Sequence, residues 1–392
     1  MKTPRTLLAA ALLAAAVSPA MAQEYVRTTP AFAPNGNSNN PWSSLAVGIW
    51  ATPASVVLNL NSNTYYEPGI INPGRSLFIK TVGGSSFIAP RPVTKTSLRI
   101  ASYNTHLFGN DLIPGLPRWK DDSRAPHIGR VAVAEGADIF LLQEVWDPAL
   151  FGAIKNTSDS YYTSGFYGGD HEGTSVLNSG LFTISRYQLA FPAQAFYEDE
   201  DGFFESMASK GYIRTTFTKN GFTITVFNTH TQSGSSSDSA TTRARQMGQL
   251  SAAISIWRAT HPDHIVILGG DFNALDTSAE FSQVMELGFG QYNDMGDGAS
   301  NVPVAGNAHD CTTCYENDLR RYFDADNHSD WRIDYILYAP PLDGSARVLP
   351  KAYNVRKYEI PAGYGTICDD GICTRDLSDH FGISLDLELQ RP

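Results

Sequence analysis

The sequence lacks long hydrophobic runs except at its N-terminus. There an apolar stretch from Leu7 to Val17 follows two basic residues and precedes Ala20-Met21-Ala22. No later segment reaches about 18 consecutive apolar residues. This layout is typical of a secretory signal peptide, and the stretch is too short to anchor the chain across a bilayer. We therefore expect residues 1–22 to be a signal peptide and the mature protein to be secreted, in the periplasm or outside the cell.

Basic residues are outnumbered by acidic ones. The chain contains 29 Lys and Arg against 40 Asp and Glu, which gives a formal net charge of −11. A negative protein repels phosphate backbones over long range, so this balance disfavours a nucleic-acid substrate, although a local basic groove can override it. The composition, 42% hydrophobic and 18% charged, is otherwise that of a globular protein.

Cysteine is scarce and confined to the last quarter of the chain. The four cysteines are Cys311, Cys314, Cys368 and Cys373. In an oxidising compartment an even number favours disulfides, and the sequence leaves open how the four pair. A four-cysteine zinc site is the alternative, but the second spacing is longer than the gap usual in such sites.

Two common functional motifs are also missing. No Gly-x-Ser-x-Gly segment is present, which argues against a serine nucleophile on a sharp strand-to-helix turn. No glycine-rich phosphate fingerprint follows a predicted strand, which argues against a Rossmann-type sheet.

The chain before residue 97 differs from the rest. Residues 23–41 are polar and predict a flexible lead-in. Residues 42–92 contain short β-type runs separated by Pro-Gly turns, and they predict a small β-rich N-terminal module. A proline-rich boundary at 89–92 then precedes the predicted catalytic domain, 97–390.

Apolar segments of strand length recur through this second region. The predicted strands are 98–103, 139–142, 181–185, 222–228, 265–268, 333–338 and 383–389. A long helix is predicted at 239–260, where Met247, Leu250 and Ile254 recur at helical spacing. Strands with interspersed helices indicate an α/β sandwich.

Polar residues stand at the ends of most of these strands. Any one of them alone is more often a turn or cap residue, but together they form one chemical set. The set comprises Asn104, Glu144, His230, Asp271, Asn273, Asp334, Asp379 and His380. Because a rigid sheet can present such groups at one rim, we expect these side chains to converge.

The set predicts a metal site. Oxygen ligands without cysteine suit Mg²⁺, or a similar cation such as Mn²⁺ or Co²⁺, rather than zinc. We predict Glu144, Asn104 and Asp379 as the metal-binding residues.

The same set predicts acid–base chemistry. His230 and His380 can exchange protons near neutral pH, and we expect Asp334 to orient His380 through its second ring nitrogen. Asp271 and Asn273 are expected to hold the attacking water or a phosphate oxygen. The arrangement fits metal-assisted, in-line attack of water on phosphorus.

Taken in order, these residues resemble the motifs of the endonuclease/exonuclease/phosphatase superfamily. The matching segments are Asn104, Gln143-Glu144, Asn228-Thr229-His230, Gly270-Asp271-Phe272-Asn273, Arg332-Ile333-Asp334-Tyr335 and Ser378-Asp379-His380. The resemblance implies a two-sheet α/β sandwich of the deoxyribonuclease-like type. It also implies Glu144 as the principal Mg²⁺ ligand, His380 as general base and His230 as the group that assists the leaving group.

Within that superfamily the chain looks most like secreted bacterial neutral sphingomyelinases of the sphingomyelinase C type. Thr229-His230-Thr231-Gln232 resembles that group's Thr-His-x-Gln, and Ser209-Lys210-Gly211-Tyr212 resembles its Asn-Lys-Gly-Phe. The resemblance implies Lys210 and Asn178 as substrate-binding residues. Asn178 lies where some members place a carboxylate beside the first histidine, which leaves the protonation of His230 open.

The implied reaction is hydrolysis of sphingomyelin, a membrane lipid, to ceramide and phosphocholine at the bilayer surface, with a monomer as the default state. The alternatives on the same fold are a secreted metal-dependent nuclease and a phosphomonoesterase. A different class of function is a binding protein whose catalytic site has been lost. The presence of a catalytically competent residue at every position of the set argues against it.

Overall fold

The computed structural model describes residues 77–82, 85–90, 93–109, 118–169, 177–198, 200–202, 205–290, 300–302, 311–369 and 371–392. The predicted signal peptide (1–22), the lead-in (23–41) and the first part of the 42–92 module lie outside the described residues. Within the described part, no helix is both long and apolar enough to cross a membrane.

The chain divides into two compact units. The first contains a hairpin in which β1 (Leu77–Val82) pairs antiparallel with β2 (Ser85–Pro90). This hairpin is the described part of the predicted β-rich module. The second unit, Lys95–Phe217 with Phe222–Pro392, spans the predicted catalytic domain.

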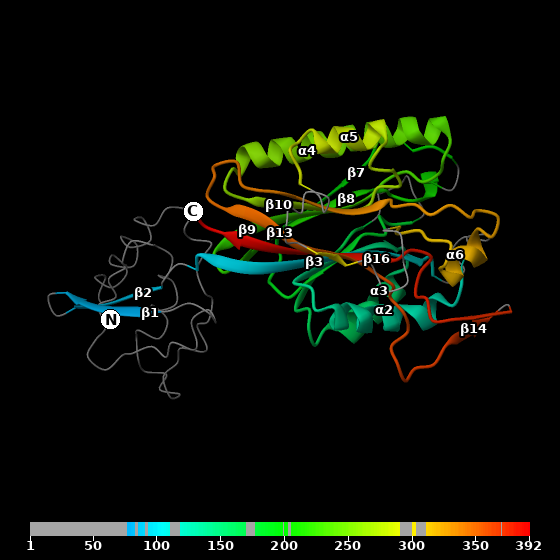
Figure 1. The fold of residues 1–392 in the computed structure, drawn as a ribbon, viewed down its shortest axis with the longest axis horizontal. Helices are drawn as coiled ribbons and strands as arrows, with labels where there is room; N and C mark the ends of the chain where they lie inside the picture. Colours follow the sequence, from blue (N-terminus) through cyan, green and yellow to red (C-terminus); the bar gives the residue numbers. More distant parts are fainter. Residues whose placement is uncertain are drawn as a thin grey trace, which may run out of the picture. The chain divides into compact units, whose positions relative to one another are not determined.

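The second unit is built on two sheets packed face to face (Figure 1). The seven-stranded sheet has the order β11-β13-β16-β3-β4-β6-β5. Its strands are β3 (Lys95–Leu107), β4 (Ile139–Val145), β5 (Ser164–Tyr167), β6 (Phe182–Ser185), β11 (Ser300–Val302), β13 (Arg347–Arg356) and β16 (Gly382–Gln390). The five-stranded sheet has the order β12-β10-β9-β8-β7. Its strands are β7 (Ala190–Phe196), β8 (Gly211–Lys219), β9 (Phe222–His230), β10 (Ile265–Asp271) and β12 (Asp334–Ala339).

Helices cover the outer face of each sheet (Figure 1). The helices α2 (Asp121–Glu135) and α3 (Pro148–Ser158) lie against the seven-stranded sheet, and α4 (Ser237–Thr260) and α5 (Ala279–Met285) lie against the other. The shorter elements are the 3₁₀ turn Glu205–Met207, α6 (Asp318–Phe323), β14 (Ile367–Asp369) and β15 (Ile372–Thr374).

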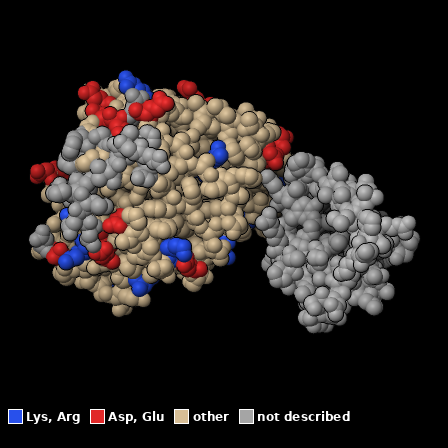
Figure 2. All heavy atoms as spheres, turned by 180° about the vertical axis from the view of Figure 1, so that it is seen from behind, with Lys and Arg blue, Asp and Glu red and all other residues tan. Residues whose placement is uncertain are grey.

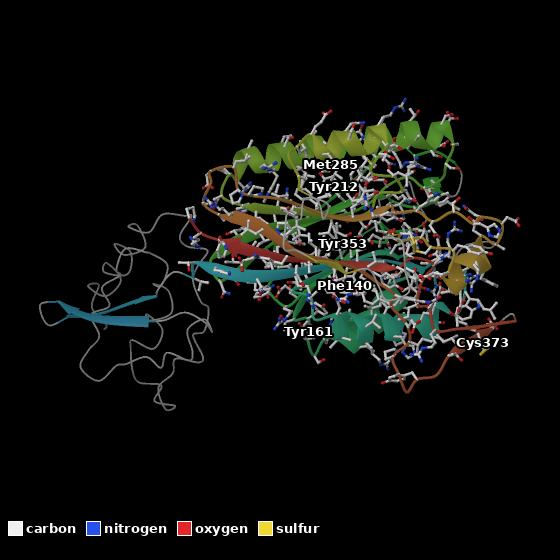
Figure 3. All side chains as sticks on the ribbon, in the orientation of Figure 1. Phe140, Tyr161, Tyr212, Met285, Tyr353 and Cys373 are labelled. Atoms are coloured by element: carbon white, nitrogen blue, oxygen red, sulfur yellow. A yellow bond between two sulfur atoms is a disulfide. The ribbon has the colours of Figure 1, made fainter. Side chains whose placement is uncertain are left out.

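The central strands are buried on both faces. In β4, Ile139 and Leu141 belong to the apolar cluster between the sheets, while Phe140 and Leu142 pack under α2 and α3. The strand β10 alternates in the same way between the inter-sheet cluster and the cluster beneath α4. Two buried faces explain why these strands read as continuous apolar runs. Figure 3 shows Phe140 on the α2 side of its sheet, Tyr353 between the sheets and Tyr212 on the α4 side.

The fold prediction is confirmed. All of the predicted strands and the long helix are present, with ends shifted by a few residues at most. The strands β7, β8 and β13 and the helices α2 and α3 were not predicted. Part of the reason is that β7 has no buried side chain and β13 has only two, so their sequences lack a clear apolar run.

The cysteines form two local disulfides, Cys311–Cys314 and Cys368–Cys373. This pairing resolves the connectivity that the sequence left open, and it excludes the zinc alternative. The first bond is buried and the second joins β14 to β15 at the surface.

Two glycines let β10 approach its neighbours. A Cβ on Gly270 would lie 1.9 Å from the carbonyl oxygen of Thr229, and Gly270 has a φ of 143°. A Cβ on Gly269 would lie 2.7 Å from a methyl group of Leu141 in the other sheet. Because only glycine lacks a Cβ, these positions allow the strand end that carries Asp271 to lie close to both sheets.

We expect Gly270→Ala to lower the free energy of unfolding by about 3 kcal/mol or more, because the new methyl group meets backbone and the φ is unfavourable for alanine. Urea denaturation measures the change. Gly152→Ala in α3 is the matched control: a Cβ there meets nothing within 4 Å, so it should be neutral or stabilising by up to about 1 kcal/mol. Equal effects of the two substitutions would contradict this account of β10.

Candidate active site

Strand register brings three residues of the predicted set side by side. The parallel pairing of β9 and β10 places His230 opposite Asp271, and the antiparallel pairing of β10 and β12 places Asp271 opposite Asp334. The five-stranded sheet therefore presents an imidazole and two carboxylates in one row at its edge.

The seven-stranded sheet supplies the next two residues. The strands β3 and β4 run parallel and carry Asn104 and Glu144 near their C-terminal ends. The Nδ2 of Asn104 donates to Glu144 Oε1 at 2.9 Å and to Asp271 Oδ2 at 2.8 Å. Asn104 thus bridges the two sheets. Because one amide nitrogen donates to both carboxylates, Glu144 and Asp271 lie close together. Glu144 has a φ of 56°, a left-handed conformation uncommon for a residue with a side chain, of the kind that clusters at functional sites.

Two overlapping groups of side chains could hold a metal ion. The first is Glu144, His230 and Asp271, and the second is Asp271, Asp334 and His380; the ligand atoms within each group lie within 4.8 Å of one another. The donors are mainly carboxylate oxygens, which suit a hard cation such as Mg²⁺. The residues fit such an ion for a second reason: three carboxylates converge in a largely buried space, where unneutralised negative charge is costly.

His380 is held by Asp334. The Nδ1 of His380 lies 2.9 Å from Asp334 Oδ2, which leaves Nε2 directed to the centre of the site, 3.9 Å from Asp271 Oδ2. Burial by itself would lower the pKa of His380, but the charge and hydrogen bond of Asp334 outweigh it and raise the pKa well above its ordinary value. The two residues thus form the contact expected from the sequence, and their catalytic roles stay predictions.

Asp271 is, like Asp334, almost completely enclosed, with 1% of its surface exposed. Burial, followed by the charge of Asp334, raises its pKa to about 7. Its Oδ1 accepts a hydrogen bond from the amide of Asn273 at 2.8 Å. Asn273, with a φ of 46°, also donates through Nδ2 to the carbonyl of Thr231.

His230 has two carboxylates near its ring but forms no hydrogen bond with either. Its Nε2 is 3.7 Å from both Glu144 and Asp271, and neither ring nitrogen forms a hydrogen bond within the described chain. Burial, and then the positive charge of Lys210, lowers its pKa well below the ordinary value. A neutral imidazole at this position can donate or accept a hydrogen bond with a substrate.

The two predicted substrate-binding residues are engaged by the protein. Asn178 donates to the carbonyl of Trp146 at 2.6 Å and to the hydroxyl of Tyr167 at 2.7 Å, and it accepts from the amide of Gly180. These contacts occupy the amide group of Asn178, and its substrate-binding role stays a prediction. The side chain that lies beside His230 is the ring of Trp146, with ring centroids 6.1 Å apart.

Lys210 is buried as well. Its ammonium pairs with Glu205 at 2.7 Å and donates to the carbonyl of Thr231 at 3.0 Å. The sequence indicated Lys210 as a phosphate-binding residue. In the structure its ammonium group is paired with Glu205, and a phosphate contact by Lys210 stays a prediction.

Asp379, predicted as a metal ligand, lies at the edge of the site. Its Oδ1 accepts from Ser378 at 3.2 Å and is 3.8 Å from the ring of His106. Burial would raise its pKa, but His106 and His380 lower it below the ordinary value. Among the described residues it is outside both candidate metal groups, so its metal role stays a prediction.

Sequence reasoning missed one residue that organises the site. Arg124 of α2 is fully buried and donates to the carbonyls of Thr105, His106 and Leu377. It is also paired with Asp121 at 2.6 Å. Arg124 therefore connects the end of β3 to the segment before His380 through hydrogen bonds. Apart from the pair with Asp121, its contacts are with backbone oxygens, which leave no signature in the sequence.

The raised pKa values predict how the stability of the metal-free protein depends on pH. The folded state keeps the proton of Asp271 up to a pKa of about 7, whereas the unfolded state releases it near pH 4. The folded state thus binds more protons, so the free energy of unfolding should fall as the pH rises from about 4 to 7. Urea denaturation in EDTA measures this, and Asp271→Asn should flatten the fall. If Asp271→Asn and the wild type show the same pH dependence of the free energy of unfolding, the raised pKa is not that of Asp271.

The chain is similar in sequence to known proteins. A phospholipase C of Staphylococcus aureus is 24% identical over 247 residues, which cover 59% of this chain and 73% of the relative. A sphingomyelinase C of Bacillus cereus is 22% identical over 231 residues, 54% of this chain and 67% of the relative.

Two solved structures share the fold. The sphingomyelinase C of Streptomyces griseocarneus superposes with a TM-score of 0.61 at 22% identity, covering 74% of this chain and 99% of that one. A variant of the Staphylococcus aureus beta toxin with bound magnesium ions gives a TM-score of 0.60 at 20% identity, covering 76% and 100%. The sequence model of the Endonuclease/Exonuclease/phosphatase family matches residues 101–380. Since this match spans most of the chain, the protein belongs to the endonuclease/exonuclease/phosphatase family.

Proposed function

We propose that the protein is a secreted, Mg²⁺-dependent phosphodiesterase that hydrolyses sphingomyelin to ceramide and phosphocholine. The observation that carries the proposal is the meeting of the His380–Asp334 pair with the carboxylates of Glu144 and Asp271. The choice of sphingomyelin as substrate is supported by the names of two relatives. These are a sphingomyelinase C of Bacillus cereus and a sphingomyelinase C 2 of Leptospira interrogans.

In this proposal His380 is the general base. Asp334 binds its Nδ1, so Nε2 faces the site and would take a proton from the attacking water. Carboxylates raise the pKa of His380 in the metal-free protein, and a bound cation would offset their charge and lower that pKa toward the range in which Nε2 can accept a proton. Asp271 and Asn273, held together by a hydrogen bond, would orient the water and a phosphate oxygen.

The remaining residues act on the phosphate and the leaving group. His230 is neutral by its lowered pKa, and it would hydrogen-bond the leaving oxygen. Glu144, with Asn104 beside it, would hold the divalent cation. A bound cation would supply positive charge beside a phosphoryl oxygen as negative charge develops there.

Secretion is supported by chemistry elsewhere in the chain. Both disulfides are formed, and such bonds persist in oxidising compartments outside the cytoplasm. A sphingomyelin headgroup lies at the outer surface of a membrane, where a secreted enzyme would meet it. We retain the signal peptide at 1–22 as part of the proposal.

A nuclease on the same fold would benefit from a continuous basic surface beside the site. On the face in Figure 2, basic side chains are scattered and several stand beside acidic ones. The net charge of −11 favours the lipid over a polynucleotide.

We expect the purified protein to release phosphocholine from sphingomyelin vesicles with Mg²⁺, to lose this activity in EDTA, and to leave plasmid DNA intact. His380→Ala should reduce turnover by about a thousandfold or more, because it removes the general base and its alignment. Phosphocholine release and DNA nicking are measured in parallel.

His261→Ala provides the control, since His261 lies at the C-terminal end of α4 and stacks on Trp257. It should keep full activity. Cleavage of DNA but not sphingomyelin, lost with EDTA and with His380→Ala, would replace the lipid by a nucleic acid. Activity on phosphomonoesters alone would assign the chain to phosphatases.

A further inference from the structure

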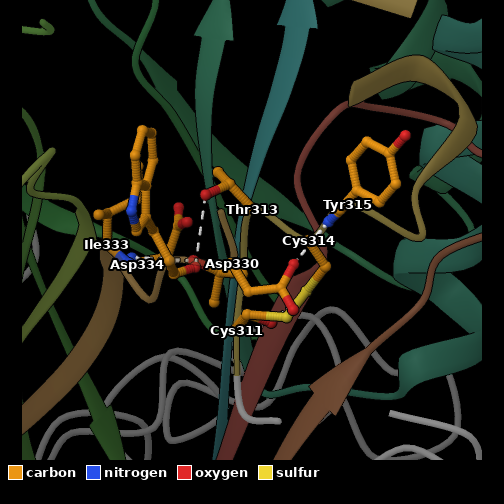
Figure 4. Close-up of a disulfide and its surroundings, with 9 residues drawn as sticks. Cys311, Thr313, Cys314, Tyr315, Asp330, Ile333 and Asp334 are labelled. Atoms are coloured by element: carbon orange, nitrogen blue, oxygen red, sulfur yellow. Dashed lines mark hydrogen bonds between the residues drawn. A yellow bond between two sulfur atoms is a disulfide. The ribbon is translucent and has the colours of Figure 1, made fainter. Parts of the chain in front are cut away.

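The loop closed by the Cys311–Cys314 disulfide lies against the catalytic pair. Both cysteines are buried, and Thr312 between them is fully buried. Figure 4 shows the disulfide with Ile333 and Asp334 close by. None of the motif segments named in the sequence analysis includes this loop, and none of the site residues described above belongs to it.

Thr312 contacts the backbone on both sides of the pair. Its hydroxyl oxygen accepts from the amides of Ile333 and Asp334, at 3.1 and 3.3 Å. Its carbonyl accepts from the amide of Phe381, the residue after His380, at 2.6 Å. One residue therefore fixes the start of β12, which carries Asp334, against the backbone next to His380.

A second contact fixes the other side of His380. The Nδ2 of Asn317 donates to the carbonyl of Ser378 at 2.9 Å, and the amide of Asn317 donates to the carbonyl of Cys314 at 3.0 Å. Asn317 is buried and caps α6. The segment 311–317 thus binds the backbone before and after His380.

We propose that the disulfide-closed loop Cys311–Cys314 is a positioning element for the catalytic pair, and that Thr312 is the positioning residue that holds Asp334 in line with His380. The proposal rests on the hydrolytic role of His380 in the proposed function, but not on the choice of sphingomyelin.

The physical reason for the disulfide is conformational. Thr312 must present its hydroxyl to β12 and its carbonyl to Phe381 at the same time. A bond between residues three apart restricts the loop to few conformations, which keeps both acceptors in place. Small displacements of catalytic groups, of the order of 1 Å, can cost about a hundredfold in rate, so this restriction matters for turnover.

We expect Thr312→Val to lower kcat about tenfold or more with KM changed less than about twofold, because the alignment of His380 is lost while the substrate contacts remain. Thr312→Ser restores the hydroxyl and should recover kcat to within about threefold of wild type. Rates are measured on sphingomyelin vesicles and on bis(p-nitrophenyl) phosphate.

Thr313→Val is the matched control from the same loop. The hydroxyl of Thr313 donates to the carbonyl of Trp331 (Figure 4), whereas the hydroxyl of Thr312 accepts from the amides of Ile333 and Asp334. It should keep kcat within about twofold of wild type. If Thr313→Val and Thr312→Val lose the same fraction of kcat, or if Thr312→Ser gives no recovery, Thr312 has only a structural role and the proposal is wrong.

A second comparison tests the disulfide. The double substitution Cys311→Ser with Cys314→Ser should lower kcat as Thr312→Val does. Cys368→Ser with Cys373→Ser removes the exposed disulfide of the β14–β15 hairpin and should leave kcat unchanged. Equal rates for the two double variants would overturn the role of the loop.

An NMR measurement keeps the proposal testable if a variant loses activity for other reasons, or if sphingomyelin is not the substrate. The proton between His380 Nδ1 and Asp334 should give a downfield resonance that is absent in His380→Ala. Thr312→Val should shift or broaden this resonance, while Thr313→Val leaves it unchanged. An unaltered resonance in Thr312→Val would refute the positioning role regardless of substrate.

Discussion

Asp271 is the group on which the rest of the site depends. This buried carboxylate accepts a hydrogen bond from Asn104 of the opposite sheet and lies within 4 Å of both histidines. A carboxylate in such a place is stable only with a proton, a cation or a hydrogen-bonding partner beside it. The surrounding residues provide the partner, and the raised pKa provides the proton when no cation is bound.

The packing of the two sheets places the carboxylate of Asp271 at the edge of both sheets. Gly269 and Gly270 remove the side chains that would hold β10 away from its neighbours, and the strand pairings set His230 and Asp334 on either side. The apolar cluster between the sheets then fixes their distance. Chemistry and packing are therefore linked through β10, since a shift of this strand moves every group of the site.

The sequence predicts the residue set of the site and most of the central strands, because strands buried on both faces read as apolar runs that end in polar residues. It does not predict which strands pair, since register depends on contacts between distant segments. It also does not predict the contacts that Asn178 and Lys210 make with other protein groups, and the substrate-binding roles of these two residues stay predictions. Arg124 and Thr312 escape notice for a related reason: they act on backbone atoms, and such contacts leave no pattern in the side chains.

The central claim is that the oxygen ligands at this edge hold a divalent cation that hydrolysis requires. Anomalous diffraction from crystals grown with Mn²⁺ tests it most directly, because the ion is located without reference to any substrate. The account predicts an anomalous peak beside the carboxylate of Glu144, and its loss in Glu144→Gln. A peak at another place in the protein, or none at saturating Mn²⁺, would contradict it.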